Sequence, residues 1–257
     1  MDLLATLVVL VILGSVLGTA FASIRPNTRA LVCLNNQRQL ANAWRLYATE
    51  HEDELPPNRD GGNAGKSRSD ASWAGGWLDY TSNTDNTNTD LLVNHTRYPY
   101  AAYLGPYVRT PAVFKCPADT SQVSIAGQWF PRVRSVSMNN ALNGRLWSTS
   151  TSFPASYEKL TQIKFAAKLF VILDEHPGSI NDPCFFSDPS TPFLMVDFPA
   201  SYHDGAGSFS FADGHAELHK WRNPRTTPRR GLLIPLNVIL PGDADVTWLQ
   251  QHAAQPN

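Results

Sequence analysis

Hydrophobic residues are most densely grouped at the start of the chain. Residues 3–24 contain no charged side chain, and Asp2 directly precedes them. As a helix, residues 3–22 would extend about 30 Å, which matches the hydrocarbon core of a bilayer. The pattern predicts a transmembrane or assembly helix over residues 3–24.

The pattern changes after this apolar run, where apolar residues recur every three or four positions and polar residues take the other faces. The recurring positions are Leu31, Leu34, Leu40, Ala41, Trp44, Tyr47 and Ala48. This period predicts an amphipathic helix over residues 27–52, with Asn27 or Thr28 as its N-cap and Pro56 beyond its end. Together the two segments would make residues 1–55 one long spine helix.

Residues 56–257 are expected to form a globular head. Its strongest strand signal is the apolar run 168–173, which contains Val and Ile. Residues 208–211 and 215–219 are expected to form a hairpin around a turn at 212–214, because the Gly of that turn accepts a positive φ.

Helices are expected in the head over residues 98–108 and 245–253, the second with Asp243 or Asp245 as its N-cap. Residues 59–90 are rich in Gly, Asn, Thr and Asp and are expected to be mostly loop. These elements predict the α+β class, with a small antiparallel sheet in a head carried by the long N-terminal helix.

The charge balance excludes one class of function. The chain carries 21 Lys and Arg residues against 22 Asp and Glu residues. It has no basic block, so it lacks the electrostatic footprint of a nucleic-acid-binding protein. The 19 Pro and 16 Gly residues, with many Asn, Ser and Thr, favour a loop-rich extracytoplasmic head.

The N-terminal apolar run has two other interpretations. A cleavable signal peptide is one, because Ala20-Phe21-Ala22 fits the small-x-small cleavage rule, although no basic region precedes the run. A signal anchor that tethers an unrelated domain is the other. The amphipathic continuation favours a spine helix over both.

Three cysteines, Cys33, Cys116 and Cys184, leave one unpaired if a disulfide forms. On a continuous helix Cys33 would stand about 13 Å beyond the apolar run, where oxidation can occur. A disulfide between Cys33 and Cys116 would tie the spine helix to the head. Two buried thiols are the alternative.

Several His and Asp residues lie close together near the end of the chain, so a metal-dependent hydrolase has to be considered. The sequence disfavours an enzyme of this kind, because it has no His-Glu-x-x-His motif, no Gly-x-Ser-x-Gly elbow and no P-loop. We expect no catalytic residue and no organic cofactor. Calcium is the weaker metal hypothesis, bound by loop oxygens of Asp174, Glu175 or Asp213.

Four features of the sequence together resemble one bacterial group. They are the apolar start MDLLATLVVLVILG, the run Cys33-Leu34-Asn35-Asn36 followed by Gln39-Leu40, the segment FKCPAD around Cys116, and His203 separated by nine residues from Asp213-Gly214. The group is that of type IV pilin-like proteins and type II secretion pseudopilins, in the form with a prepilin-type N-terminus and a C-terminal His-x9-Asp-Gly motif.

The resemblance implies a pilin-like fold and a non-enzymatic subunit that assembles into a filament or pseudopilus. Its partners would be other copies of itself, bound through the N-terminal helices, together with the inner-membrane assembly machinery and a prepilin peptidase. Membrane lipid would surround the apolar helix before assembly. The head would lie outside the inner membrane, in the periplasm, at the cell surface or on an extracellular filament.

Asp2 takes the place of the Glu that this family carries near the start of its apolar helix. A carboxylate at the edge of a bilayer is costly unless a cation meets it. In such assemblies the equivalent group pairs with the N-terminal amine of a neighbouring subunit; a solvated acid among lipid headgroups is the alternative. The family's short leader, its cleavage site and the following Phe are missing, so we expect the true start to lie upstream of Met1.

Within the C-terminal motif, Asp213-Gly214 is expected to form the hairpin turn. His203 lies in the loop that enters the hairpin, and we expect it to lock that loop by binding a backbone carbonyl.

The competing function is a membrane-anchored module that binds a glycan or a protein and does not polymerise. An exposed aromatic loop with Trp73, Trp77 and Tyr80 would provide its binding surface.

Overall fold

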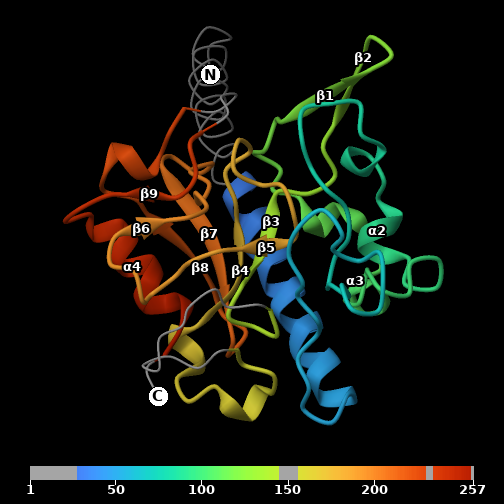
Figure 1. Cartoon of the computed structure of the whole chain (residues 1–257), viewed down its shortest axis with the longest axis horizontal. Coiled ribbons are helices and arrows are strands. Elements are labelled where there is room, and N and C mark those ends of the chain that lie inside the picture. The colour runs from blue at the N-terminus through green and yellow to red at the C-terminus, as the bar shows by residue number, and fades with distance from the viewer. Residues whose placement is uncertain (1–27, 145–155, 230–233, 256–257) are drawn as a thin grey trace, which may run out of the picture.

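The computed structural model describes residues 28–144, 156–229 and 234–255. Within these ranges the chain folds around a five-stranded sheet. A long helix, blue in Figure 1, lies behind this sheet in that view.

This helix occupies residues 28–50 of the described chain and is followed by a turn at residues 51–53. Its buried residues recur every three or four positions and are Cys33, Gln37, Leu40, Ala41, Ala43, Trp44, Tyr47 and Ala48. The predicted amphipathic helix is therefore confirmed. Its buried stripe starts at Cys33 and not at Leu31, whose side chain is 66% exposed.

The central sheet has the strand order β5-β3-β4-β7-β8. Its strands are β3 (Val136–Asn139), β4 (Phe170–Asp174), β5 (Cys184–Phe185), β7 (Ala206–Phe211) and β8 (Ala216–Lys220). β5 lies parallel to β3, and the other neighbours pair antiparallel. β4 occupies the centre and is buried at every position, which explains its apolar run over residues 170–173.

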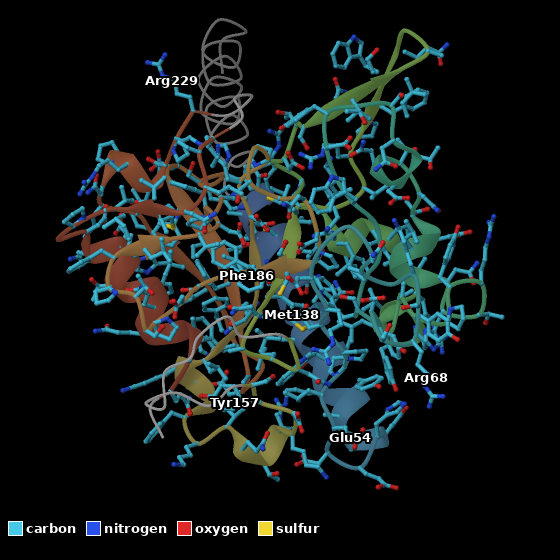
Figure 2. All side chains as sticks on the ribbon, viewed as in Figure 1. Glu54, Arg68, Met138, Tyr157, Phe186 and Arg229 are labelled. Atoms are coloured by element: carbon cyan, nitrogen blue, oxygen red, sulfur yellow. The ribbon has the colours of Figure 1, made fainter. Side chains whose placement is uncertain are left out.

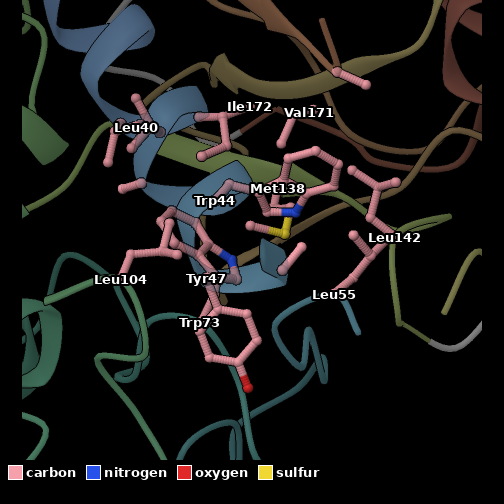
Figure 3. Packing of buried hydrophobic residues seen from close by; sticks show 14 of the residues in the cluster. Leu40, Trp44, Tyr47, Leu55, Trp73, Leu104, Met138, Leu142, Val171 and Ile172 are labelled. Atoms are coloured by element: carbon pink, nitrogen blue, oxygen red, sulfur yellow. The ribbon is translucent and has the colours of Figure 1, made fainter. Parts of the chain in front are cut away.

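Helix 28–50 covers one face of the sheet. Leu40 and Trp44 of this helix share a hydrophobic core with Met138 of β3 and Ile172 of β4, and Figure 3 shows these side chains in close packing. Figure 2 places Met138 near the middle of the molecule.

The opposite face carries a second core. Phe209 of β7 packs edge-to-face on Trp248 of helix α4 (Ala244–Ala253), at a centroid distance of 5.1 Å. Along β7, Phe209 faces α4 while Ser208 faces helix 28–50, where Gln37 donates a hydrogen bond to it. The described chain thus has three layers, with the sheet between two helices.

Short elements complete the structure. They are the hairpin β1 (Gln122–Ile125) and β2 (Gln128–Pro131), the pair β6 (Leu194–Met195) and β9 (Val238–Ile239), the helices α2 (Asp90–Val93) and α3 (Gly105–Val108), and the 3₁₀ turns η1 (Thr84–Asn86), η2 (Pro111–Phe114), η3 (Leu160–Gln162), η4 (Ala166–Lys168) and η5 (Pro224–Thr226). The β1–β2 hairpin extends away from the rest of the chain (Figure 1).

The predicted pilin-like fold class is wrong. Of the spine helix predicted over residues 1–55, the described part is the helix over residues 28–50. Among the described helices, none combines the length and the apolar character needed to cross a bilayer. The sheet is mixed and five-stranded, because β5 joins it parallel to β3, and is not small and antiparallel. Residues 3–24 and Asp2 lie outside the described residues.

Two strands of the sheet escaped prediction for physical reasons. β5 has only two residues, and β3 alternates apolar and polar residues over only four positions, so neither strand carries a pattern long enough to stand out from a loop. The strand β4, the β7–β8 hairpin and helix α4 are confirmed. Asp243 caps α4 by accepting from the Asp245 backbone N–H.

The predicted helix over residues 98–108 is wrong for most of its length. Only α3, the four residues Gly105–Val108, is helical there. Ala102 has a φ of 56°, which interrupts a helix, and Pro106 in the first turn of α3 favours a helix start at that point.

Candidate functional site

Cys33 and Cys116 lie close together at the N-terminal end of helix 28–50, on its buried side. Cys33 lies on the buried stripe of helix 28–50 and Cys116 lies in the loop after η2; both are almost fully buried. The backbone N–H of Cys116 donates to Ser135 Oγ at 2.8 Å, which fixes the loop. Apolar side chains of Ala118, Ala200 and Tyr202 complete this small cluster.

Asp174, the last residue of β4, places a carboxylate beside Cys33. Its Oδ1 accepts a hydrogen bond from Ser135 Oγ at 2.9 Å, and its Oδ2 accepts from Cys33 Sγ at 2.9 Å and from Ser208 Oγ. Burial raises the pKa of Asp174 to about 6, although these three hydrogen bonds favour the carboxylate and oppose the rise.

His203 reaches the same place from the loop before β7. The backbone N–H and C=O of His203 both pair with Ala206, and positive φ values at Asp204 and Gly205 close this turn tightly. The His203 Nε2 atom lies 3.3 Å from Cys116 Sγ. The loop is thus locked through the backbone of His203, and its imidazole faces a thiol.

The ligand atoms of Cys33, Cys116, Asp174 and His203 all lie within 4.8 Å of one another. In the part of the chain that the structure describes, no other group of three or more His, Cys, Asp or Glu side chains converges in this way. Sequence reasoning singled out each of the four residues, but for separate reasons. The structure joins them into one cluster.

Protons are held tightly on both thiols of the cluster. The hydrogen bond with Cys116, burial and the charge of Asp174 all raise the pKa of Cys33. For Cys116 the hydrogen bond with Cys33 lowers the pKa, but burial and the charge of Asp174 outweigh it and raise the pKa. The two thiols are therefore protonated and unreactive at neutral pH unless a cation binds near them.

The structure contains Cys33, Cys116 and Cys184 as free cysteines. The two sulfurs that the disulfide hypothesis pairs lie within 4.8 Å of each other, so it has the proximity that it needs. The arrangement observed is that of the alternative, two buried thiols. The disulfide stays a prediction.

The three calcium candidates do not share a site. Asp174 faces Cys33, whereas Glu175 accepts from Ser179 Oγ at 2.7 Å on the other side of the strand. Asp213 lies beyond the far end of β7, where its Oδ1 accepts from the backbone N–H of His215. The carboxylate of Asp174 contacts Ser208 of β7, whereas Asp213 lies two residues beyond the end of that strand.

Only part of the aromatic loop of the competing hypothesis lies at the surface. Trp73 is fully buried and donates its indole N–H to the Pro183 carbonyl at 3.0 Å. Tyr80 is exposed and borders a cavity of about 410 Å³ together with Trp129 of β2. An aromatic binding surface would therefore have to use Tyr80 and Trp129, and not Trp73.

Residues 22–169 match the family described as "Protein of unknown function (DUF1559)". The match covers more than half of the 257 residues of the chain. The chain belongs to this family. No curated protein and no solved structure matches it.

The DUF1559 match ends one residue before β4 begins. It therefore includes Cys33 and Cys116, while Asp174 and His203 lie in the C-terminal part of the chain. The cluster joins the matched region to the region that carries the His-x9-Asp-Gly motif.

The two ends of this motif contact helix 28–50, which belongs to the DUF1559 region, at two positions along its length. Near Cys33, the loop before β7 brings in His203. At the other end of β7, Arg45 Nη1 donates to the backbone carbonyl of Asp213 at 2.6 Å. The predicted hairpin turn at Asp213-Gly214 is confirmed, with a φ of 97° at Gly214.

Replacing Gly214 by alanine is expected to lower the free energy of unfolding by about 1 to 2 kcal/mol, because alanine is strained at this φ. Its Cβ would also approach Arg45 Nη1 to 2.9 Å. Gly127, with a φ of 79° and open space around a Cβ, provides the matched alanine variant. Urea denaturation should show the larger loss for Gly214→Ala; equal losses would mean that the contact with Arg45 contributes nothing.

The polar residues that support the cluster were missed by sequence reasoning. Ser135 and Ser208 donate to Asp174, and Gln37 donates to Ser208 at 3.1 Å. Gln37 offered a signal, because it is a polar residue on the stripe that the helical period assigns to the core. Ser208 and Ser135 offered none, since serine is common in strands and loops alike.

Proposed function

We propose that this DUF1559 protein is a non-enzymatic structural subunit, held at a membrane by residues 3–24, with its head outside the cytoplasm. Copies of the chain would associate through this segment and the adjoining first turns of helix 28–50. The observation that carries the proposal is an exposed apolar pair, Leu31 and Val32, in the first turns of helix 28–50, with only residues 25–30 between it and the apolar run.

The geometry of the helix supports this arrangement. One side of helix 28–50 is packed on the sheet, so the helix is fixed to the head. On the other side Leu31 and Val32 are 66% and 43% exposed. Single exposed apolar residues are ordinary. This pair follows an apolar run of about 20 residues, and we expect lipid or a second copy of the same segment to cover it.

The chemistry of the head also favours a structural role. Cys33, Cys116 and Asp174 are buried against apolar side chains, and so offer little access to a substrate. The resemblance to proteins of type IV pilus and type II secretion systems extends the proposal to a filament. This extension rests on the N-terminal segment and on sequence motifs, and not on the fold.

Site-directed cross-linking tests the proposal. Leu31→Cys places a reactive thiol on the proposed contact. Thr49→Cys provides the matched control, because residues 31 and 49 are 18 positions apart, and so share a helix face about 27 Å apart. The native cysteines are buried and should not react. A monofunctional maleimide would establish that both new thiols are accessible.

In membranes containing the full chain, a short bismaleimide should give a covalent dimer with Leu31→Cys and little or none with Thr49→Cys. Deleting residues 3–24 should abolish the dimer. Equal cross-linking at both positions, or none at either, would contradict the proposed contact. A membrane-bound chain without cross-links would favour the monomeric binding module.

A further inference from the structure

We propose that Cys33, Cys116, His203 and Asp174 together bind one Zn²⁺ ion, as a closed structural site that joins helix 28–50 to the head. This site goes beyond the proposed assembly function and does not depend on it. Its four ligands come from the helix, the loop after η2, the end of β4 and the loop before β7.

The spacing of the ligand atoms fits a tetrahedral ion. Around Zn²⁺, with bonds of about 2.0 to 2.3 Å, ligand atoms lie roughly 3.3 to 3.8 Å apart. The structure has Cys116 Sγ 3.3 Å from His203 Nε2 and Cys33 Sγ 2.9 Å from Asp174 Oδ2. Since every separation is within 4.8 Å, side-chain adjustments of about 1 Å complete the geometry.

The donor set selects the metal. Two sulfurs, one imidazole nitrogen and one carboxylate oxygen suit Zn²⁺, whereas Ca²⁺ and Mg²⁺ require oxygen ligands. Four protein ligands fill a tetrahedral shell, which is typical of a structural and not of a catalytic zinc site. A disulfide would need only the two cysteines, and would leave the convergence of His203 and Asp174 on them without a role.

The surroundings orient the ligands as a zinc site requires. Ser135 and Ser208 bind the two oxygens of Asp174, and Gln37 in turn donates to Ser208. Such outer hydrogen bonds fix the carboxylate in the direction of the ion. The apolar side chains of Ala200 and Tyr202 exclude water from the same place.

The protonation state of each ligand determines the net charge of the occupied site. The thiols of Cys33 and Cys116 each release one proton and bind as thiolates, His203 binds as the neutral imidazole, and Asp174 binds as the carboxylate. With Zn²⁺ the site has a net charge of −1. The dication thus reverses the preference of these buried thiols for the protonated form.

The test uses the full chain in detergent, purified under reducing conditions. The metal content of the purified protein should be one zinc per chain. After removal of metal with a chelator, Co²⁺ should bind with one equivalent and give the d–d bands of a tetrahedral ion and a thiolate-to-cobalt charge-transfer band. Competition with Zn²⁺ should remove these bands.

Cys116→Ser and His203→Ala should each lower zinc affinity by more than 100-fold. Ser208→Ala keeps all four ligands and should lower it by about 10- to 100-fold. Cys184→Ser provides the matched control, because Cys184 is also a buried cysteine but lies in β5, in a separate hydrophobic cluster. It should bind zinc like the parent chain.

Circular dichroism would establish that each variant is folded. If a ligand variant does not fold, the cobalt spectrum of the parent chain and the affinity of Ser208→Ala still decide the question. Failure of the folded, reduced parent chain to bind one equivalent of Zn²⁺ or Co²⁺ at micromolar concentration would overturn the proposal. Unchanged binding by Cys116→Ser and His203→Ala would also overturn it, as would a Cys33–Cys116 disulfide whose reduction gives no metal uptake.

Discussion

Replacing Trp44 by alanine is expected to lower the free energy of unfolding by about 3 to 5 kcal/mol. Trp44 is fully buried and lies where helix 28–50 packs against Met138 and Ile172 of the sheet (Figure 3). The substitution removes a large apolar surface and leaves a cavity that the rigid sheet fills poorly. A loss of this size is about a fifth or more of the stability of a typical domain.

Two further variants separate packing from other effects. Leu46→Ala changes the exposed side of the same helix, where the side chain is 50% exposed, and should cost less than about 0.5 kcal/mol. Trp44→Phe keeps an aromatic ring and removes the indole N–H, which has no hydrogen-bond partner among the described residues. Chemical denaturation should rank the losses Trp44→Ala, Trp44→Phe, Leu46→Ala; similar losses for Trp44→Ala and Leu46→Ala would contradict the three-layer core.

The second large effect is expected from Arg134→Met, and it should depend on pH. Arg134 is fully enclosed, and its Nη1 donates to the Val136 carbonyl and to Ser137 Oγ. Burial lowers the pKa of Arg134 to about 10, while the charges of Glu175 and Asp182 oppose the decrease. It therefore remains a cation below pH 9, beside buried carboxyl groups.

The carboxyl groups determine the sign of the pH dependence. Burial, followed by the charge of Asp197, raises the pKa of Glu175, and burial raises the pKa of Asp197 to about 8. A carboxyl group whose pKa is raised by folding favours the folded state at low pH, where it is protonated. This contribution to the free energy of unfolding is lost as the pH rises from about 4 towards the pKa of the folded state. Arg134 limits this loss, because it favours the ionised form of Glu175.

Arg134→Met should therefore cost about 1 to 2 kcal/mol at pH 5, where mainly two hydrogen bonds are lost. At pH 9 the cost should reach about 3 to 5 kcal/mol, because a buried carboxylate then loses its cation. Arg132→Met is the matched control, since this buried arginine donates to the carbonyls of Pro177 and Ile180. Denaturation at both pH values should show a pH-dependent loss of stability for Arg134→Met alone. A loss that is the same at pH 5 and pH 9 for both variants would contradict the proposed interaction of Arg134 with the buried carboxyl groups.

Local signals in the sequence predicted the elements that depend on local physics. The amphipathic period identified helix 28–50, the apolar run identified β4, and the turn residues Asp213-Gly214 identified the β7–β8 hairpin. The mixed sheet depends on a contact that no local pattern encodes, the parallel pairing of the two-residue β5 with β3. The error in fold class concerns the sheet, because the expected antiparallel strands leave out this parallel pairing.

The candidate site shows the same division. The sequence singles out Cys33, Cys116, Asp174 and His203 one by one, and for His203 it predicts only a loop-locking role. Their convergence requires helix 28–50, β4 and β7 to be packed in a particular order, which is a property of the tertiary structure. A hypothesis that joined the separate motif matches around Cys33, Cys116 and His203 would have found three of the four residues.

Because both ends of β7 contact helix 28–50, the number of residues between His203 and Asp213 must match the distance between two points on that helix. His203 at one end and Asp213 at the other are matched to positions about 12 residues apart on one rigid helix, Cys33 and Arg45, or roughly 18 Å of helix length. Deleting or inserting a single residue between them would turn one part of β7 over, so that phenylalanines would face the helix and serines the second core. The length of this segment is therefore constrained more strictly than its composition.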